Sequence, residues 1–362
     1  MMFYIAYTGF ELTEVSGIWT KILGQAYAFE KKLGEVYCTA LSNQMAYLMH
    51  GNDVVEKEAA VTRKDYLTVI LKWLKKYQTD RTYIRYPFAD KWFIELLKYQ
   101  KDHGIRTVLE IPTYPYDGEL AYGRVKVEDA YYRKMVSEYV DFIASYSKYD
   151  TIWGRKCITL VNGIDAAKYK VKRKNDHVNR ITLIAVSSSM TFWNGFERII
   201  EGMKIYKQSN GEYDVFLKLV GKGADEKYYK KLAADYGLEN QVEFCGFLTG
   251  KALDDVYSQS DVAVNSLGSY KKKLEVGASL KGAEYCARGI PIVCGYTDIR
   301  FPEGCPFVLQ VENNSSPLKI GDIIAFYEKV SAQDGYEEKI HDYAVKYLNW
   351  DYIMQRVIDY LK

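Results

Sequence analysis

The chain has 362 residues, of which 48% are hydrophobic, and its 49 basic residues nearly balance its 47 acidic ones. This length allows two α/β domains of ordinary size. The balanced charge excludes a strong basic field, so we expect no nucleic-acid partner. The six cysteines include no Cys-x-x-Cys pair and the four histidines no His-x-His pair. We therefore expect reduced thiols, a cytoplasmic protein and no metal site.

The amino-terminal run 1–7 is short and strand-like, without the positive region and long apolar segment of a signal peptide. No run reaches the roughly 18 apolar residues that a membrane-spanning helix needs. We therefore expect a soluble or peripheral protein.

The first half of the chain alternates strands and helices. Strands are predicted at 3–7, 35–40, 82–86, 106–111, 151–153 and 157–160, and helices at 17–32, 64–77, 90–103 and 128–146. The segment 41–63 is ambiguous, with a hairpin as one alternative. Alternation of this kind predicts an α/β fold with a parallel, doubly wound sheet.

A second alternation follows the turn sequence at 161–165 and a basic stretch at 168–179, which is predicted to be a linker. Its strands are predicted at 181–186, 215–220 and 306–311, and its helices at 194–207, 225–236, from about 320, and at 336–362 with a break at Trp350. We expect an N-terminal domain at 1–165, a second domain at 166–345, and a C-terminal helix at 346–362 that packs back on the first domain.

Two segments of the second half have the pattern of an anion site. The predicted strand 215–220 ends in a Gly-Lys-Gly turn before a helix, so backbone N–H groups remain free there. In 278–293, a short predicted helix has Ser279, Lys281 and Glu284 near its start. The N–H groups and Lys281 can bind phosphates, and Glu284 can accept both hydroxyls of a ribose. Alternatively, Glu284 only complements the helix dipole and Lys281 is solvated.

Several motifs resemble the GT-B glycosyltransferases of family 4, especially bacterial enzymes of capsule and exopolysaccharide assembly. They are Val-Asn-Gly-Ile-Asp at 161–165, the segment 192–202, Val-Gly-Lys-Gly at 220–223, Val-Glu-Phe-Cys-Gly-Phe at 242–247 and the block 284–293. In the first half, 83–87 and 111–117 are similar to the capsule subgroup. The resemblance covers nearly the whole chain and implies two Rossmann-like domains facing across a cleft.

The resemblance also implies a reaction. A hexose-type sugar would pass, with retention, from a UDP- or GDP-linked donor to a hydroxyl of a saccharide, expected to be lipid-linked, in capsular or extracellular polysaccharide synthesis. The chain has no Asp-x-Asp pattern for Mg²⁺ or Mn²⁺, so we expect metal-independent transfer with no cofactor beyond the nucleotide sugar. Catalytic roles are expected for Glu275, Lys281 and Glu284. Donor contacts are expected from Gly17, Ser188, Ser189, Asn194, Gly221, Lys222, Phe247, Ser279, Leu280, Lys281 and Glu284.

The chain departs from the family pattern. Of two glutamates usually eight positions apart, Glu284 fits the second, but the first position holds Val276, with Glu275 displaced by one. The arginine and lysine that commonly hold the diphosphate correspond to Ser189 and Asn194. The usual first-domain histidine is not identifiable. An internal-return mechanism, in which the leaving phosphate helps to deprotonate the acceptor, needs no dedicated base.

Acceptor contacts are expected from the first domain, since the carboxyl ends of parallel strands line the crevice. The candidates are Lys21, Arg85, Tyr86, Thr113, Tyr114 and Tyr116. Aromatic rings stack on sugar faces, and Arg85 can bind a phosphate. The alternatives are a helix start with a surface lysine at 17–21, and rigid turns at the Tyr-Pro pairs.

Three further alternatives stay open. The basic, aromatic stretch 63–106 suits peripheral contact with an anionic inner membrane leaflet, or is simply a solvated face. A GT-B nucleotide-sugar 2-epimerase is disfavoured, because no catalytic histidine and acidic set is identifiable. A degenerate transferase that binds a nucleotide sugar as a scaffold subunit is motivated by Val276, Ser189 and Asn194.

Overall fold

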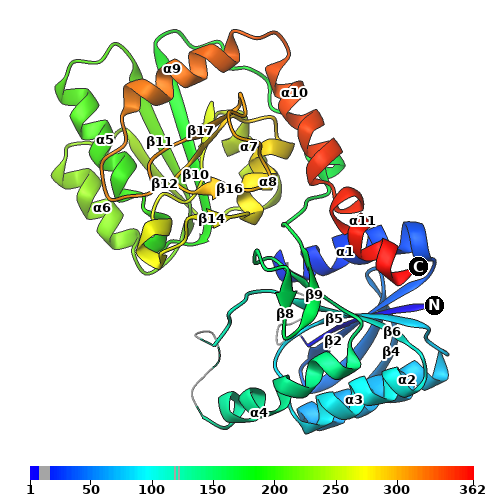
Figure 1. The fold of residues 1–362 in the computed structure, drawn as a ribbon. Coiled ribbons are helices and arrows are strands. Elements are labelled where there is room, and N and C mark those ends of the chain that lie inside the picture. Colours follow the sequence, from blue (N-terminus) through cyan, green and yellow to red (C-terminus); the bar gives the residue numbers. More distant parts are fainter. Residues whose placement is uncertain (8–16, 118–119, 121–122) are drawn as a thin grey trace. The chain divides into compact units, whose positions relative to one another are not determined.

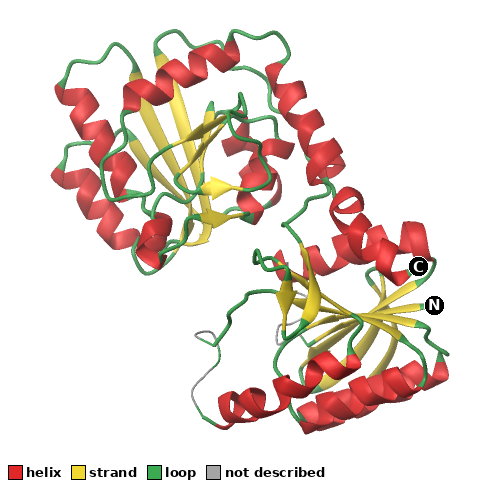
Figure 2. Cartoon of the chain, viewed as in Figure 1, coloured by secondary structure: helices red, strands yellow, loops and turns green. Residues whose placement is uncertain are grey.

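The computed structural model describes residues 1–7, 17–117, 120 and 123–362 (Figure 1). These residues form two compact units. The N-terminal unit comprises 1–161 and 350–362, and the C-terminal unit comprises 162–349. In each unit, helices lie on both faces of a sheet (Figure 2).

The sheet of the N-terminal unit has nine strands in the order β4-β3-β2-β1-β5-β6-β7-β9-β8. The strands are β1 (Met2–Ala6), β2 (Val36–Ser42), β3 (Met45–His50), β4 (Asp53–Ala59), β5 (Arg81–Arg85), β6 (Arg106–Ile111), β7 (Phe142–Ser145), β8 (Thr151–Ile152) and β9 (Arg155–Thr159). From β2 through β1, β5, β6 and β7 to β9 the pairing is parallel, whereas β3, β4 and β8 add antiparallel edges.

The central strand β1 is buried on both faces, which explains its continuous apolar sequence. Phe3 and Ile5 belong to the core formed with α2 (Arg63–Lys76) and α3 (Lys91–Asp102). Tyr4 belongs to the opposite core, formed with α1 (Gly17–Leu33) and α11 (Trp350–Leu361). The C-terminal helix therefore packs in the N-terminal unit. At Gly24 of α1, an added Cβ would lie 2.3 Å from Nε1 of Trp350, so only glycine lets the two helices approach this closely.

One helix prediction in this unit is wrong in its second half. The segment 128–146 was expected to be one helix, but α4 (Arg124–Tyr139) ends before Val140, whose backbone is extended. The short apolar run of β7 then pairs between β6 and β9 and is mostly buried. Three consecutive apolar residues fit a helix or a strand equally well, and the pairing with the neighbouring strands β6 and β9 decides. The ambiguous segment 41–63 contains β3 and β4. Strand β3 pairs antiparallel with β2, and β4 pairs antiparallel with β3.

The C-terminal unit has a parallel six-stranded sheet in the order β12-β11-β10-β13-β15-β17. Its strands are β10 (Arg180–Ser189), β11 (Asp214–Lys222), β12 (Val242–Gly246), β13 (Val262–Val264), β15 (Ile292–Cys294) and β17 (Val308–Gln310), with a separate pair β14 (Val276–Gly277) and β16 (Thr297–Asp298). Its α-helices are α5 (Glu197–Gln208), α6 (Glu226–Asp235), α7 (Gly250–Ser258), α8 (Leu280–Ala287), α9 (Ile320–Ser331) and α10 (Tyr336–Tyr343). Short helical turns are η1 (Ala166–Lys168), η2 (Phe192–Asn194), η3 (Ser269–Lys272) and η4 (Ala344–Leu348). The predicted linker continues from η1 to the start of β10 without a strand or α-helix.

Candidate functional site

The strand order of the C-terminal unit reverses between β10 and β13, because the chain moves outward to β11 and β12 and then returns to β13. In parallel α/β sheets, ligands bind at such a point, outside the carboxyl ends of the strands. The loops after β10, β11 and β13 and the amino end of α8 belong to this edge of the sheet. Most of the predicted donor residues therefore belong to one edge of the C-terminal unit.

The carboxyl ends of β10 and β11 pack against each other through glycine. Gly221 has φ +127°, and an added Cβ would lie 1.7 Å from the carbonyl oxygen of Ser187. The N–H group of Met190 donates to the carbonyl of Lys222 at 2.8 Å. This close approach leaves the side chains of Ser188, Ser189 and Lys222 exposed at the sheet edge.

Ser279 is the N-cap of α8, and its hydroxyl is fully engaged in fixing the helix start. Its Oγ accepts from the Gly282 N–H at 3.3 Å and from the Tyr296 hydroxyl at 3.0 Å, and it donates to Oδ1 of Asn265 at 3.0 Å. Nδ2 of Asn265 donates to the Tyr296 hydroxyl at 3.0 Å, which closes the network. A ligand here would therefore meet the backbone N–H groups of Leu280 and Lys281, which begin the helix, rather than the serine hydroxyl.

Further residues position α8, and the sequence did not identify them as part of the site. Nδ2 of Asn162 donates to the carbonyl of Ala278 at 2.8 Å. Arg300 and Asp298 form a buried ion pair, and an added Cβ at Gly282 would lie 2.6 Å from Nη2 of Arg300. Asn162 lies in the turn motif at 161–165, which was a usable signal. Asn265, Tyr296 and Arg300 belong to no motif in the sequence.

Lys281 is a partly buried cation in the first turn of α8. Its Nζ lies 5.9 Å from the centre of the Phe196 ring, and burial lowers its pKa to about 8. In the part of the chain that the structure describes, no carboxylate forms an ion pair with it. The amino end of α8 therefore combines an unpaired ammonium group with the positive end of a helix dipole.

Glu284 lies one turn further along α8 and is only partly exposed. Its Oε1 accepts from Nε of Arg288 at 3.0 Å. Burial raises the pKa of the Glu284 carboxyl, and the Arg288 charge opposes this rise. Glu275, expected to contact the donor sugar, is exposed just before β14 and its carbonyl accepts from the Thr297 N–H at 2.9 Å.

The remaining donor candidates are placed differently from one another. Asn194 is buried, and its Oδ1 accepts from the Thr191 N–H at 2.8 Å, so its side chain holds the turn η2 together. Phe247 and Leu280 are exposed, at 59% and 43% of their surface. Gly17 is the first residue of α1 in the N-terminal unit.

In the N-terminal unit, Lys21 and Arg85 converge on Glu110, which is fully buried on β6. Nζ of Lys21 lies 3.7 Å from Oε1 of Glu110, and Arg85 donates to the same oxygen. Burial raises the pKa of Glu110, but Lys21 and Arg85 together hold it below its usual value. Burial lowers the pKa of Lys21 to about 8. Two cations thus share one carboxylate at the carboxyl ends of β5 and β6.

The predicted acceptor tyrosines are largely packed inside the N-terminal unit. Tyr86 and Tyr116 are buried, and both hydroxyls donate to the buried Asp129. Tyr114 is partly exposed, and its ring packs edge-on against Tyr149 at 5.0 Å. Thr113 is also partly exposed. Of the acceptor candidates, Arg85, Thr113 and Tyr114 therefore retain side-chain surface for a ligand, and the acceptor assignment stays a prediction.

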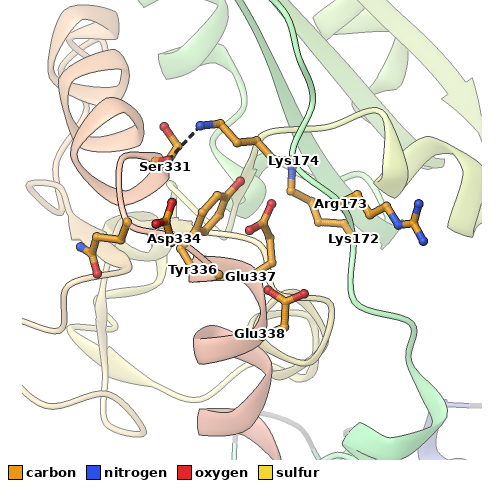
Figure 3. Close-up of a pocket in the computed structure, with 10 residues that line it drawn as sticks. Lys172, Arg173, Lys174, Ser331, Asp334, Tyr336, Glu337 and Glu338 are labelled. Carbon is orange, nitrogen blue, oxygen red and sulfur yellow. Dashed lines mark hydrogen bonds between the residues drawn. The ribbon is translucent and has the colours of Figure 1, made fainter.

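A hollow of about 250 Å³ lies elsewhere on the C-terminal unit, between the segment 172–174 and the start of α10 (Figure 3). Nζ of Lys174 donates a hydrogen bond to the carbonyl oxygen of Ser331 at 2.9 Å in this hollow. Three basic and three acidic side chains line the hollow, so its charges compensate each other. None of the predicted site residues is among its lining residues.

Within the described ranges, no group of three or more His, Cys, Asp and Glu side chains is arranged to hold a metal ion. No described helix is both long and apolar enough to cross a membrane.

The chain is similar to known glycosyltransferases in part of its sequence and in its structure. Residues 168–300 match the family model described as Glycosyl transferases group 1. No curated protein sequence matches the chain. A glycosyltransferase from Rickettsia africae ESF-5 has a similar structure, with a TM-score of 0.64 and 14% identity over 100% of this chain and 97% of that chain.

Two other solved structures are similar at the same level. For sucrose-phosphate synthase from Thermosynechococcus elongatus, the TM-score is 0.64 with 15% identity over 98% of this chain and 96% of that one. For a lipopolysaccharide outer core galactosyltransferase, the TM-score is 0.60 with 14% identity over 99% of both chains. These matches establish the fold alone. The chain has the two-domain GT-B fold, as expected, and its residues 168–300 are similar to the glycosyltransferase group 1 model.

Proposed function

We propose that the protein transfers a hexose-type sugar from a UDP- or GDP-linked donor to a hydroxyl of a saccharide acceptor. The observation that carries this proposal is Lys281, an ammonium group at the amino end of α8 without a carboxylate partner among the described residues. A buried or partly buried cation is usually paired. A diphosphate bound at this helix end would supply the missing negative charge.

Catalysis in such a site consists mainly of stabilising charge on the departing diphosphate. The N–H groups of Leu280 and Lys281 and the ammonium of Lys281 would act on it, and their positions are fixed in advance by Ser279 and its partners. This arrangement needs no metal ion. Glu284 would accept the ribose hydroxyls, and Glu275 would contact the donor sugar after a small loop adjustment. With no dedicated base, we propose retention through internal return.

The acceptor is proposed to be a lipid-linked saccharide in capsular or extracellular polysaccharide synthesis, bound through Arg85, Thr113 and Tyr114. The similar structures include a galactosyltransferase of the lipopolysaccharide outer core, which supports a saccharide acceptor without identifying it. We propose a cytoplasmic protein that contacts the membrane peripherally.

Several side chains of the stretch 63–106 that could contact a membrane are engaged in contacts within the protein. Trp73 is fully buried, and Lys72 and Lys76 pair with Glu58 and Glu56 of β4. Lys64 and Lys75 lie over the rings of Trp92 and Tyr99, with Nζ 4.5 Å and 5.0 Å from the ring centres, so cation–aromatic pairs remain in this stretch. Pelleting with liposomes of increasing anionic lipid content tests the contact. No binding at any content would end the membrane proposal but leave the transferase proposal intact.

The transferase proposal is tested by screening UDP- and GDP-sugars for a rise in melting temperature, because a ligand of the folded state stabilises it. The stabilising donor is then assayed for hydrolysis and transfer with the wild type and Glu284→Ala. Turnover that falls strongly in Glu284→Ala supports the proposal. Nucleotide binding without turnover of any donor would instead support the scaffold alternative, and no binding would contradict both.

A further inference from the structure

Arg288 connects Glu284 to the neighbouring helix α7. Its Nε donates to Oε1 of Glu284 at 3.0 Å, and its Nη1 lies 2.7 Å from Oδ1 of Asp254. The guanidinium also lies over two rings, 4.1 Å from the centre of Tyr257 and 5.0 Å from that of Tyr169. The side chain of Arg288 is 8% exposed. Two carboxylates and two rings therefore fix the plane of this guanidinium.

This arrangement differs from an ordinary ion pair on a helix surface. An exposed pair four residues apart contributes only about 0.3–0.5 kcal/mol and leaves both side chains mobile. Lys231 and Asp235 of α6 form such a pair, with side chains 73% and 51% exposed. Arg288 is buried instead, and its planar fork holds carboxylates in a defined direction. The contact thus restricts the orientation of Glu284.

Glu284 keeps the capacity to bind a ligand while it is held. An ionised carboxylate has about four acceptor positions on its two oxygens, and Nε of Arg288 uses one of them. The Glu284 side chain is 22% exposed, so part of it remains accessible. Arg288 also opposes the effect of burial on the pKa of Glu284 and so favours the ionised form.

We infer that Arg288, tethered by Asp254, is a positioning residue that directs the Glu284 carboxylate at the ribose diol of the donor nucleotide. The inference rests on the proposed function, since it assumes that a ribonucleotide binds at α8. It predicts that this chain distinguishes ribonucleotides from 2′-deoxyribonucleotides through Arg288, although Arg288 itself does not touch the nucleotide.

The direct test compares UDP with 2′-deoxy-UDP, and GDP with 2′-deoxy-GDP, by calorimetry on the full chain. The wild type should prefer the ribonucleotide by about tenfold or more, as expected for a hydrogen bond to a charged group. In Arg288→Met this preference should fall to about twofold or less, because the Glu284 carboxylate is no longer held toward the ribose. Arg288→Lys should recover part of it, because a lysine keeps the charge but not the planar fork. Lys231→Met, which breaks the exposed pair on α6, should keep the wild-type preference.

Two further variants keep the test decisive if Arg288→Met folds poorly. Asp254→Asn weakens the tether of Arg288, and because the Asp254 side chain is half-exposed, its loss should have only part of the effect of losing Arg288. The ribose preference should therefore fall by about threefold, compared with about tenfold for a full charged hydrogen bond. In a Glu284→Gln background, replacing Arg288 should change the preference no further, since the two residues act as one unit. An unchanged preference in Arg288→Met or Asp254→Asn would overturn the inference alone. A wild type that binds neither UDP nor GDP would overturn the proposed function as well.

Discussion

Replacing Lys281 with methionine removes the ammonium group but keeps a side chain of similar length. If the group contacts a diphosphate, the loss equals a hydrogen bond to a charged partner, about 1.5–3 kcal/mol. Nucleotide affinity and kcat/KM should therefore fall by about 10- to 150-fold. Calorimetry with UDP and GDP measures the first quantity, and a donor-turnover assay measures the second. Lys231→Met, at an exposed position on α6, is the matched control and should leave both unchanged.

The pH dependence gives this prediction a second signature. With a pKa of about 8, Lys281 is about nine-tenths protonated at pH 7 and about one-tenth at pH 9. Because only the charged form attracts a diphosphate, wild-type affinity should fall by about tenfold over this interval. Lys281→Met should show little change over the same interval. Equal pH profiles for the two proteins would refute the reasoning, even if the affinities differed.

The charge of Lys281, which favours nucleotide binding, should lower the folding stability of the nucleotide-free protein. Its pKa is lowered from 10.5 to about 8 on folding, so the unfolded chain binds more protons between these pH values. Folded-state stability from this group therefore rises with pH across that window, and below it the buried charge is destabilising. At about 1.4 kcal/mol per pKa unit, Lys281→Met should stabilise the nucleotide-free protein at pH 7 by at most about 3 kcal/mol. A lower melting temperature for the variant would contradict this.

Three other substitutions test the surrounding structure. Gly221→Ala should destabilise the protein by about 2–4 kcal/mol in chemical denaturation, since φ is +127° and the new Cβ would meet the Ser187 carbonyl; a change below about 0.5 kcal/mol would show that the loop yields freely. Tyr296→Phe removes a donor to Ser279 and should cost about 1 kcal/mol and several-fold in nucleotide affinity, whereas unchanged affinity would separate the network from the site. Glu110→Gln leaves Lys21 and Arg85 uncompensated and should cost about 3 kcal/mol at pH 7. The pKa of Glu110 is lowered in the folded state. The stability difference between wild type and Glu110→Gln should therefore be fully present above the usual pKa near 4.5, and it should disappear as the pH falls through the lowered folded-state pKa. A stability difference that stays constant with pH would be inconsistent with that lowered pKa.

The sequence predicted those parts of the fold and site that are contiguous in the chain. The loop between β11 and α6 and the start of α8 each combine a strand or helix period with a glycine or a cap within about ten residues. Asn265, Tyr296 and Arg300 could not be assigned, because they reach Ser279 and Gly282 only after the chain has folded. β7 was missed for a related reason, since a short apolar run becomes a strand only between β6 and β9.

Buried polar residues show the same limit of sequence reasoning. Asn194 and Tyr86 stand after strand or turn signals, where ligand contacts are common. In the structure, the Asn194 side chain accepts from the backbone of Thr191, the N-cap of η2, and Tyr86 donates to the buried Asp129. Nothing in their local sequence distinguishes a side chain that turns inward from one that faces a ligand.

The central claim is that the amino end of α8 binds the diphosphate of a nucleotide sugar. A crystal structure of the protein with UDP or GDP, whichever binds more tightly, tests it most directly. The account predicts phosphate oxygens within hydrogen-bonding distance of the Leu280 and Lys281 N–H groups and of the Lys281 ammonium, with the ribose hydroxyls on Glu284. A nucleotide bound elsewhere, with Lys281 still lacking an anionic partner, would contradict the account.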